Sequence, residues 1–196
     1  LTIDPAPLVV TALDARRTYG AANPGFAARY DGFVLGQDAG VLDGRLELAT
    51  EAGQDADAGR HAITAGGLSS GNYAIRYQSG TLTVDPAALT VTALDARRIY
   101  GAANPGFVAR LDGFVLGEDA SALDGELRLG SRAGRASGVG RYAITATGLT
   151  SGNYAITYRP GTLTVEPAAL TVTALDAARV AGAANPAFAA RFDGFV

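Results

Sequence analysis

The sequence predicts an all-β protein built from tandem small antiparallel β-sandwich domains of immunoglobulin-like kind. Three observations lead to this prediction. Apolar and polar residues alternate in short segments, as they do in strands with one buried face. Residues that favour turns, such as glycine, proline, asparagine and aspartate, separate these segments. The whole arrangement then recurs at a fixed spacing along the chain, which indicates repeated domains.

The repeat is the strongest of these signals. The segment LVVTALDARRTYGAANPGF begins at Leu8, and close variants begin at Leu89 and Leu170, 81 residues apart each time. The first two copies differ at 24 of 81 aligned positions and need no insertion or deletion. A period of this length is close to the size of a small domain that buries its own core. We therefore divide the chain into four parts: the tail of a preceding repeat (1–7), repeat domain 1 (8–88), repeat domain 2 (89–169) and the truncated start of a third repeat (170–196).

Short segments containing proline connect the copies. They read Asp85-Pro86-Ala87-Ala88 and Glu166-Pro167-Ala168-Ala169, and we expect them to leave neighbouring domains with limited freedom. Residues 170–196 hold only the first strands of a domain. Most of their apolar face should therefore lack partners.

Within one copy the alternation predicts six or seven short strands. The first is typified by Leu89-Thr-Val-Thr-Ala in repeat 2. The Arg45 and Glu47 charges of repeat 1 are exchanged in repeat 2 while the leucines beside them stay, which is typical of a solvent face next to a core face. The alternating positions of repeat 1 are, in order, Phe26, Ala28 and Tyr30; Leu46 and Leu48; His61, Ile63 and Ala65; Tyr73, Ile75 and Tyr77; and the final strand Thr81-Leu82-Thr83-Val84.

Turns and one helical turn fill the spaces between these strands. Asp38 can cap a short helical turn over residues 38–42, because alanine and leucine there are good helix formers. No segment keeps a helical period. The predicted turns lie at Asn23-Pro24-Gly25, Asp43-Gly44, Gly66-Gly67 and Gly71-Asn72.

Composition excludes several functional classes. The formal net charge is only −3, which gives no electrostatic reason to bind nucleic acid or an anionic membrane. The absence of cysteine excludes disulfides and thiolate metal sites. No apolar run reaches the length of a membrane span, so we expect no membrane insertion of this fragment.

A set of landmarks resembles a known family. They are the Leu-Thr-Val-Thr-Ala start, Tyr19-Gly20 followed by Asn23-Pro24, the strand Gly59–Ile63, Asn72-Tyr73 and the closing Gly80-Thr81-Leu82-Thr83-Val84. Together they resemble the MBG repeats of the Tyr-Gly type, over essentially the whole chain. The resemblance implies tandem copies in large bacterial surface proteins similar to filamentous haemagglutinin and exported by two-partner secretion. The third copy departs from the pattern, because Ala181-Gly182 stands where Tyr-Gly is expected.

Candidate cation ligands are present, but they are not arranged as a repeated site. Asp55 and Asp57 have the spacing that begins a calcium loop, yet the aligned residues 136–140 contain no acid. Acids kept in two or more copies could instead meet at a domain interface, although such residues more often cap turns. Those acids are Asp14, Asp31, Asp38, Asp43 and Asp85. We assign no metal site and no cofactor.

Catalytic residues are not expected either. The single histidine, His61, is replaced by Tyr142 in the next copy, which argues against a repeated acid–base or metal role. Neither a Cys–His pair nor a repeated Ser–His–Asp triad can be assembled. Paired carboxylates for glycoside chemistry remain a formal alternative, but we predict no catalytic residue and no enzyme.

Three further groups have both a binding and a structural interpretation. Asn23-Pro24 could form a binding loop, but it is more readily a turn. The Arg16-Arg17 and Arg97-Arg98 pairs could bind an acidic glycan, or charge a strand edge against aggregation; only Arg179, after Ala178, remains in the third copy. Tyrosines could stack on sugars or pack in the core, and their alternation with isoleucine favours the core. These tyrosines are Tyr73, Tyr77, Tyr154 and Tyr158.

The functional prediction follows from the repeat and the resemblance. We expect a structural spacer repeat of an exported bacterial adhesin, at the extracellular face of the cell, with neighbouring repeats of the same chain as its partners. The alternative is a multivalent adhesion module with a weak site for a host glycan or surface protein in each copy. An enzyme is the third and least favoured class.

Overall fold

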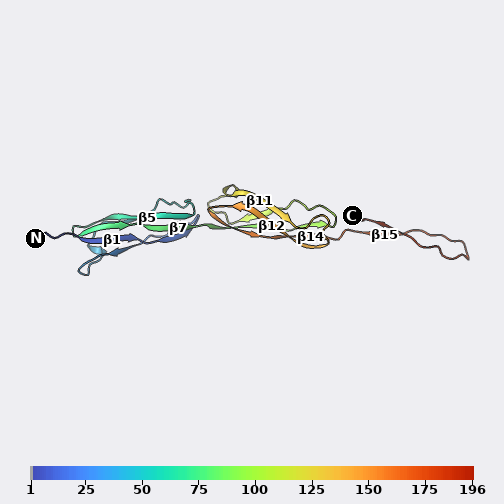
Figure 1. The fold of residues 1–196 in the computed structure, drawn as a ribbon, viewed down its shortest axis with the longest axis horizontal. Coiled ribbons are helices and arrows are strands. Elements are labelled where there is room, and N and C mark those ends of the chain that lie inside the picture. The colour runs from blue at the N-terminus through green and yellow to red at the C-terminus, as the bar shows by residue number, and fades with distance from the viewer. Residues whose placement is uncertain (1) are drawn as a thin grey trace. The chain divides into compact units, whose positions relative to one another are not determined.

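The computed structural model describes residues 2–196, and these residues are almost entirely strand and turn. Repeat 1 contains seven strands, and repeat 2 contains seven more at equivalent positions (Figure 1). The all-β prediction and the predicted number of strands are confirmed. In repeat 1 the elements are β1 Ala6–Ala12, β2 Ala15–Thr18, β3 Ala28–Asp31, η1 Ala39–Val41, β4 Asp43–Ala49, β5 Gly59–Ser69, β6 Tyr73–Gln78 and β7 Gly80–Asp85.

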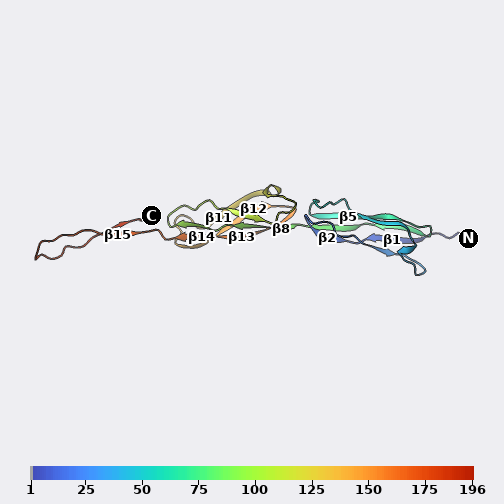
Figure 2. The same ribbon diagram turned by 180° about the vertical axis from the view of Figure 1, so that it is seen from behind.

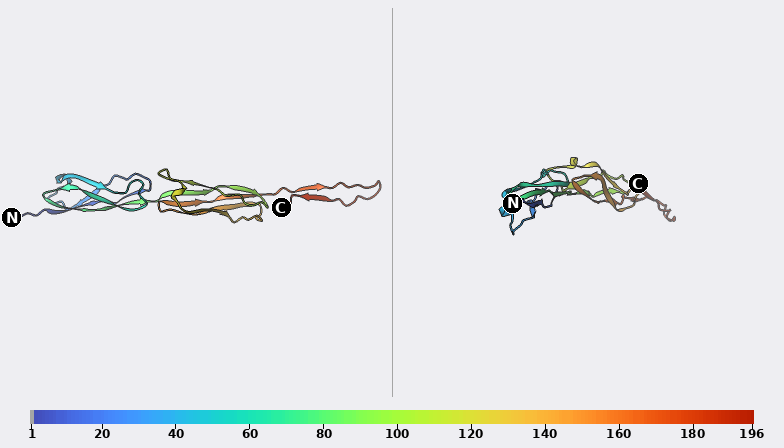
Figure 3. Two further views of the ribbon diagram at one scale, coloured as in Figure 1. Left: turned by 90° about the horizontal axis from the view of Figure 1, so that it is seen from above. Right: turned by 60° about the vertical axis from the view of Figure 1, so that its left-hand side comes forward.

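The elements of repeat 2 follow the same order. A further hairpin of two strands follows it, and both of its strands are exposed along their length (orange to red in Figure 3). The elements of repeat 2 are β8 Ala87–Ala93, β9 Ala96–Ile99, β10 Ala109–Asp112, η2 Ala120–Ala122, β11 Asp124–Ser131, β12 Gly140–Thr150, β13 Tyr154–Arg159 and β14 Gly161–Glu166, and those of the hairpin are β15 Thr171–Ala174 and β16 Ala190–Asp193.

Each repeat has a three-stranded and a four-stranded sheet. In repeat 1 the strand orders are β3-β1-β6 and β2-β7-β5-β4, and repeat 2 repeats them as β10-β8-β13 and β11-β12-β14-β9. The predicted β-sandwich class is confirmed, and most pairs are antiparallel as expected, but β1 pairs with β6 and β2 pairs with β7 in parallel. The reason is that the first strand of the repeat is divided: β1 joins one sheet and β2, directly after it, joins the other (Figure 2).

The break between β1 and β2 explains one repeated motif. The Asp14 carboxylate accepts a hydrogen bond from the Thr81 backbone N–H, at 2.7 Å. A side chain at Gly80 would have its Cβ only 2.5 Å from the Ala12 carbonyl oxygen, so only glycine fits there. Asp95, Thr162 and the other equivalent residues of repeat 2 reproduce this arrangement. The Gly-Thr pair therefore closes the sandwich where the first strand changes sheets.

Three of the predicted turns are not turns, because Asn23-Pro24-Gly25 lies in an irregular segment without a turn and two glycines of the other motifs lie within strands. Gly44 lies in β4 and Gly67 lies in β5, where the register of the β4–β5 ladder shifts. Both glycines have positive φ, and a Cβ on either would lie 2.2 Å from a backbone oxygen of the facing strand. Glycine is thus required here by a bulge that lets two strands approach closely, and not by a chain reversal.

The core lies where the alternation predicted it. Leu82 and Val84 of β7 are buried, as is Ile63 of β5, which pairs with it, and the equivalent Leu163, Val165 and Ile144 are buried in repeat 2. The exchanged charges at Arg45 and Glu47 are exposed. The predicted helical turn is also present, as the 3-10 helix η1, and Asp38 caps it by accepting from Gly40 N at 2.8 Å.

Contacts group the residues into two compact units. The first contains the residues up to Leu89 together with Asp112–Gly125 and Leu149–Thr157, and the second contains Thr90–Leu111, Glu126–Gly148 and Tyr158–Val196. The first unit therefore includes two segments that belong to repeat 2 by sequence. These two segments form the site described below.

Candidate repeat-joining site

The site lies inside the first compact unit and takes residues from both repeats. Tyr19 follows the end of β2 in repeat 1. The segment Val115–Glu118 follows β10 in repeat 2, Tyr154 is the first residue of β13, and Asn153 directly precedes it. All of these residues belong to the first unit. We call Tyr19, Glu118 and Tyr154 the tyrosine–glutamate cluster.

The cluster is held by two hydrogen bonds to one carboxylate. The Tyr19 hydroxyl donates to Glu118 Oε1 at 2.7 Å, and the Tyr154 hydroxyl donates to Glu118 Oε2. The two rings meet edge to face, with centroids 5.7 Å apart and planes at 79°. This is a favourable arrangement of aromatic rings. Tyr19 is 5% exposed and Tyr154 is 3% exposed, so the contact is well shielded from water.

A tight turn aims the carboxylate at the two hydroxyls. Glu118 N donates to Val115 O at 3.0 Å, and the two residues between them have positive φ, 57° at Leu116 and 75° at Gly117. Two central residues with positive φ define a type I′ turn, in which leucine is unfavourable because of its Cβ. Repeat 1 has the same turn at Val34–Gln37, with Leu35 at 57°. The same strained leucine therefore occurs at the equivalent point of both repeats.

The cluster keeps both tyrosines protonated. The hydrogen bond to Glu118, followed by burial and the negative charge of Glu118, raises the pKa of Tyr19 to about 12. Burial is the main cause of the raised pKa of Tyr154, and the bond to Glu118 comes second. Both hydroxyls are thus donors at neutral pH. Charge-assisted hydrogen bonds of this kind are stronger than neutral ones.

Apolar contacts surround the cluster. A Cβ on Gly20 would lie 2.6 Å from Val115 Cγ2, so the glycine leaves the space that the valine fills. One buried hydrophobic cluster contains Ile63 and Leu82 of repeat 1, Tyr19, and also Leu89 and Tyr154. The core of repeat 1 is therefore continuous with side chains of repeat 2.

Asn153 adds a polar clasp beside the tyrosines. Its side-chain oxygen accepts from Ala58 N at 2.8 Å, and its side-chain nitrogen donates to Asp57 Oδ1 at 2.8 Å. Its backbone oxygen accepts from Ala87 N at 2.9 Å. The Asn-Tyr motif thus contributes both of its side chains to the site.

The arginine pairs are not two-residue basic patches. Arg16 is exposed and pairs with Asp85, Nη2 to Oδ1 at 2.7 Å, which lowers the pKa of that carboxyl. Arg17 is only 6% exposed; its Nε donates to Asn23 Oδ1 at 2.7 Å, and Nη2 donates to Gly53 O. Arg17 lies on the opposite face of the strand from Arg16 and therefore points inward.

The Asn-Pro motif has a structural role. Asn23 accepts from Arg17 and donates through Nδ2 to Ala52 O at 2.8 Å, which ties the loop after β2 to the loop after β4. Arg98 and Asn104 form the same links in repeat 2, at 2.8 Å to each other and 2.7 Å from Asn104 to Ala133 O. Asn23 therefore holds two loops together, but it does not form the predicted turn: residues 22–27 carry no turn, and the turn after β2 lies at Thr18–Ala21, where Ala21 N donates to Thr18 O at 3.0 Å.

His61 has the same role as the tyrosine that replaces it. Its Nε2 lies 2.9 Å from Asp57 O, and the Tyr142 hydroxyl donates to Gly138 O, the equivalent carbonyl, at 2.8 Å. Either side chain therefore holds the same loop. This explains how the two can exchange between repeats.

The acidic candidates do not converge. Among residues 2–196 no group of three histidine, aspartate or glutamate side chains is placed to hold a metal ion. Asp14 and Asp38 accept from backbone N–H groups, Asp31 pairs with Arg29, and Asp57 binds Asn153.

The tyrosines divide into two groups. Tyr73 and Tyr154 are buried, which confirms the core interpretation, whereas Tyr77 is 38% exposed and its hydroxyl bonds the backbone of Leu68. Tyr158 is half-buried.

The sequence analysis did not single out Tyr19 with Glu118, because 99 residues separate them. A signal was present all the same. Position 118 and its equivalent, Gln37, both carry a hydrogen-bond acceptor of the same length, and the Tyr73 hydroxyl donates to Gln37 Oε1 at 2.6 Å.

Together, the fold and the site define a tandem β-sandwich module in which side chains of one copy are packed into the next. The MBG domain (YGX type) matches residues 8–83 and again residues 89–164. The chain belongs to this family. The family is a structural module and not a known enzyme family. Tyr19-Gly20-Ala21 and Tyr100-Gly101-Ala102 stand at the positions of its YGX motif. No curated protein matches the chain. In residues 2–196 no helix is long and apolar enough to cross a membrane.

Proposed function

We propose that the chain is a structural spacer of an exported bacterial surface adhesin, in which MBG repeats hold a binding region away from the cell. The tyrosine–glutamate cluster carries this proposal. A spacer must transmit position and force from one copy to the next, and so it needs joints that resist bending. A shared buried cluster and a shielded carboxylate with two donors supply such a joint.

The tandem family match supports the same role. Repeats 1 and 2 both keep the tyrosine, the glycine beside it and an acceptor at position 37 or 118. A module whose residues serve its neighbours gains by repetition, because each added copy buries the end of the one before. The extracellular setting is part of the proposal and rests on the resemblance to repeats of surface proteins.

The joint can be tested by scattering on the full chain. We expect Glu118→Ala to increase flexibility between the repeats, because Tyr19 and Tyr154 both lose their acceptor. Gln37→Ala is the matched control: it removes the equivalent side chain in repeat 1, which bonds Tyr73. Small-angle scattering should show the same flexibility for the wild type and the control and a greater flexibility for the Glu118→Ala variant. Indistinguishable profiles for all three proteins would contradict a stiffening role.

The setting needs a separate test. Antibodies raised against the purified chain should label intact, unpermeabilised cells of the bacterium that produces it. Labelling that appears only after the cells are opened would contradict the surface location and leave the mechanical role of the joint untouched.

A further inference from the structure

The surface around Tyr100 in repeat 2 is built like the surface around Tyr19. Tyr100 N donates to Glu166 O at 2.8 Å, as Tyr19 N donates to Asp85 O at 2.7 Å. Gly101 and Gly20 have nearly the same φ, 82° and 80°. The backbone therefore presents the two tyrosines in the same way.

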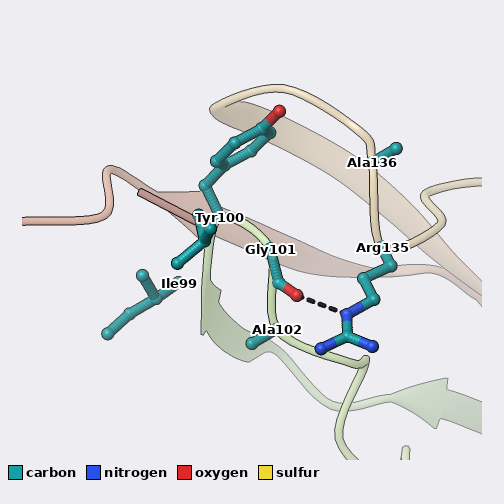
Figure 4. A pocket seen from close by; sticks show the side chains of 7 residues that line it. Ile99, Tyr100, Gly101, Ala102, Arg135 and Ala136 are labelled. Carbon is teal, nitrogen blue, oxygen red and sulfur yellow. Dashed lines mark hydrogen bonds between the residues drawn. The ribbon is translucent and has the colours of Figure 1, made fainter. Parts of the chain in front are cut away.

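The two surfaces differ in what covers them. Tyr19 is 5% exposed beneath Glu118 and Tyr154, whereas Tyr100 is 37% exposed. Beside Tyr100 an open pocket of about 620 Å³ is formed within the second compact unit (Figure 4). Its lining is Ile99, Tyr100, Gly101, Ala102, Arg135, Ala136 and Val196.

Val196 indicates what belongs in this pocket. It is equivalent to Val115, and it approaches Gly101 as Val115 approaches Gly20: the distances to a Cβ built on each glycine are 2.7 and 2.6 Å. The first residue of the covering turn is thus already in its place.

We propose that the pocket beside Tyr100 is the binding surface for a following MBG repeat, and that it selects a repeat with a carboxylate at the position of Glu118. This inference rests on the proposed function, because it extends the observed joint to the next copy. The Tyr100 hydroxyl donates to the incoming carboxylate, and the residue equivalent to Tyr154 packs against the Tyr100 ring.

The preference for a carboxylate comes from the neighbouring loop. Arg135 replaces Gln54, and both donate to the carbonyl of the motif glycine at 2.6 Å: Gln54 Nε2 to Gly20 O, and Arg135 Nε to Gly101 O (dashed in Figure 4). Arg135 therefore brings a positive charge beside the motif glycine, where Gln54 is neutral. The loop of repeat 1 carries Glu51, Asp55 and Asp57, while the equivalent loop of repeat 2 carries Arg132 and Arg135 and no acid. The charge of this surface has therefore changed sign from acidic to basic.

The test completes the third repeat on the full chain. Residues 116–169 are copied after Val196, and the reactivity of single tyrosines toward tetranitromethane is measured by peptide mass spectrometry. In the unextended chain Tyr19 should be protected and Tyr100 reactive, which provides an internal control. In the extended chain Tyr100 should lose its reactivity and match Tyr19. Circular dichroism and amide exchange confirm that the added residues fold.

Two substitutions test the selectivity. In the added residues, changing the copy of Glu118 to alanine should restore the reactivity of Tyr100, and changing it to glutamine should restore part of it. Arg135→Gln, which reproduces Gln54, should reduce the difference between the glutamate and glutamine versions.

The outcomes separate the two proposals. Protection of Tyr19 with continued reactivity of Tyr100 in a folded, extended chain would overturn the binding surface and leave the observed joint intact. Reactivity of Tyr19 in every version would overturn the joint and the proposed function with it. Protection of Tyr100 that is insensitive to the added glutamate would overturn the carboxylate selection.

Discussion

Arg17 shows how much a single residue can stabilise this fold. Its guanidinium is buried and bonded to the Asn23 side chain and to the carbonyls of Thr18, Gly53 and Gln54. Removing one partner from such a network leaves the others unsatisfied, which costs more than the bonds themselves contribute. Arg17 therefore acts as an internal cross-link between loops.

We expect Arg17→Met to lower the free energy of unfolding by about 2–4 kcal/mol. Arg16→Met is the control on the adjacent residue and should have a much smaller effect, since the Arg16–Asp85 pair is exposed. Urea denaturation of the full chain followed by circular dichroism gives both values. Equal effects would show that Arg17 is not buried in solution.

Tyr19 gives the site a dependence on alkaline pH. Its ordinary pKa of 10.0 is raised to about 12 in the folded protein. A raised pKa stabilises the fold fully below pH 10, and this stabilisation is lost as the pH rises from there through about 12. Tyr19→Phe removes this ionisation, so its stability should decline less steeply over that window than that of the wild type. Denaturant unfolding at a series of pH values measures the two slopes, and parallel slopes would show that Tyr19 does not contribute.

The structural roles of some single residues could be predicted from the sequence, and those of others could not. The capping role of Asp38 could be predicted, because a cap depends on neighbours along the chain. The burial of Arg17 was missed, because two adjacent arginines suggest an exposed edge. The third copy contains a sign of this difference. Arg179 keeps the position of Arg17 and Asn185 keeps that of Asn23, whereas the exposed Arg16 is replaced by Ala178.

Among the elements, the type I′ turn at Val34–Gln37 carries strain that could be removed. Leu35 has φ 57° and is 92% exposed, so it loses backbone freedom without gaining burial. Leu35→Asn should raise the free energy of unfolding by about 1 kcal/mol, since asparagine tolerates this conformation better. Thermal melting of the full chain tests this, and Leu35→Ala, which keeps a Cβ without the polar side chain, is the control. A lower melting temperature for the asparagine variant would contradict the strain.

The last strand of each repeat offers a matched pair of core substitutions. Leu82 in β7 and Leu163 in β14 are both 0% exposed. Replacing either with alanine should cost about 2–5 kcal/mol, through lost burial and the cavity left behind. Denaturant unfolding measures both variants. A cost below about 1 kcal/mol would place that strand at the surface, contrary to the fold.

For the strands, their positions could be predicted from the sequence but their pairing could not. Alternation located the strands and their buried faces, because it depends only on the two-residue period of a strand. It could not give the parallel pairing of β2 with β7, which depends on where the first strand changes sheets. Bulges such as those at Gly44 and Gly67 cannot be told from turns in the sequence, because both favour glycine at a positive φ.

For the whole molecule, the most direct prediction concerns the clasp at Asn153. Asn153→Ala should accelerate amide hydrogen exchange at Ala58, because that N–H loses its acceptor. Asn72→Ala, at the equivalent position of repeat 1, should leave the exchange at Ala58 unchanged. Exchange measured by NMR on the full chain distinguishes them, and unchanged exchange at Ala58 in both variants would show that the clasp does not form in solution.

The domain boundaries after residues 88 and 169 stay a prediction. The family matches and the compact units divide the chain by different criteria, and the first unit takes in two segments of repeat 2. The repeat could be found from the sequence because its period is fixed. The contact between the copies could not be found in this way, because Tyr19 and Glu118 lie 99 residues apart in the chain and no local pattern links them.

The alanine at position 181 has a consequence for an array joined in this way. Because the motif tyrosine is missing there, a joint between that copy and a following one would lack the hydrogen bond that Tyr19 donates to Glu118, and we expect it to be weaker. Cooperativity along a linear array depends on such nearest-neighbour ties, so unfolding under load would begin or halt at the weak one. Under tension, joints that follow a copy with alanine would then open before the other joints. The repeats on either side would stay folded at that force.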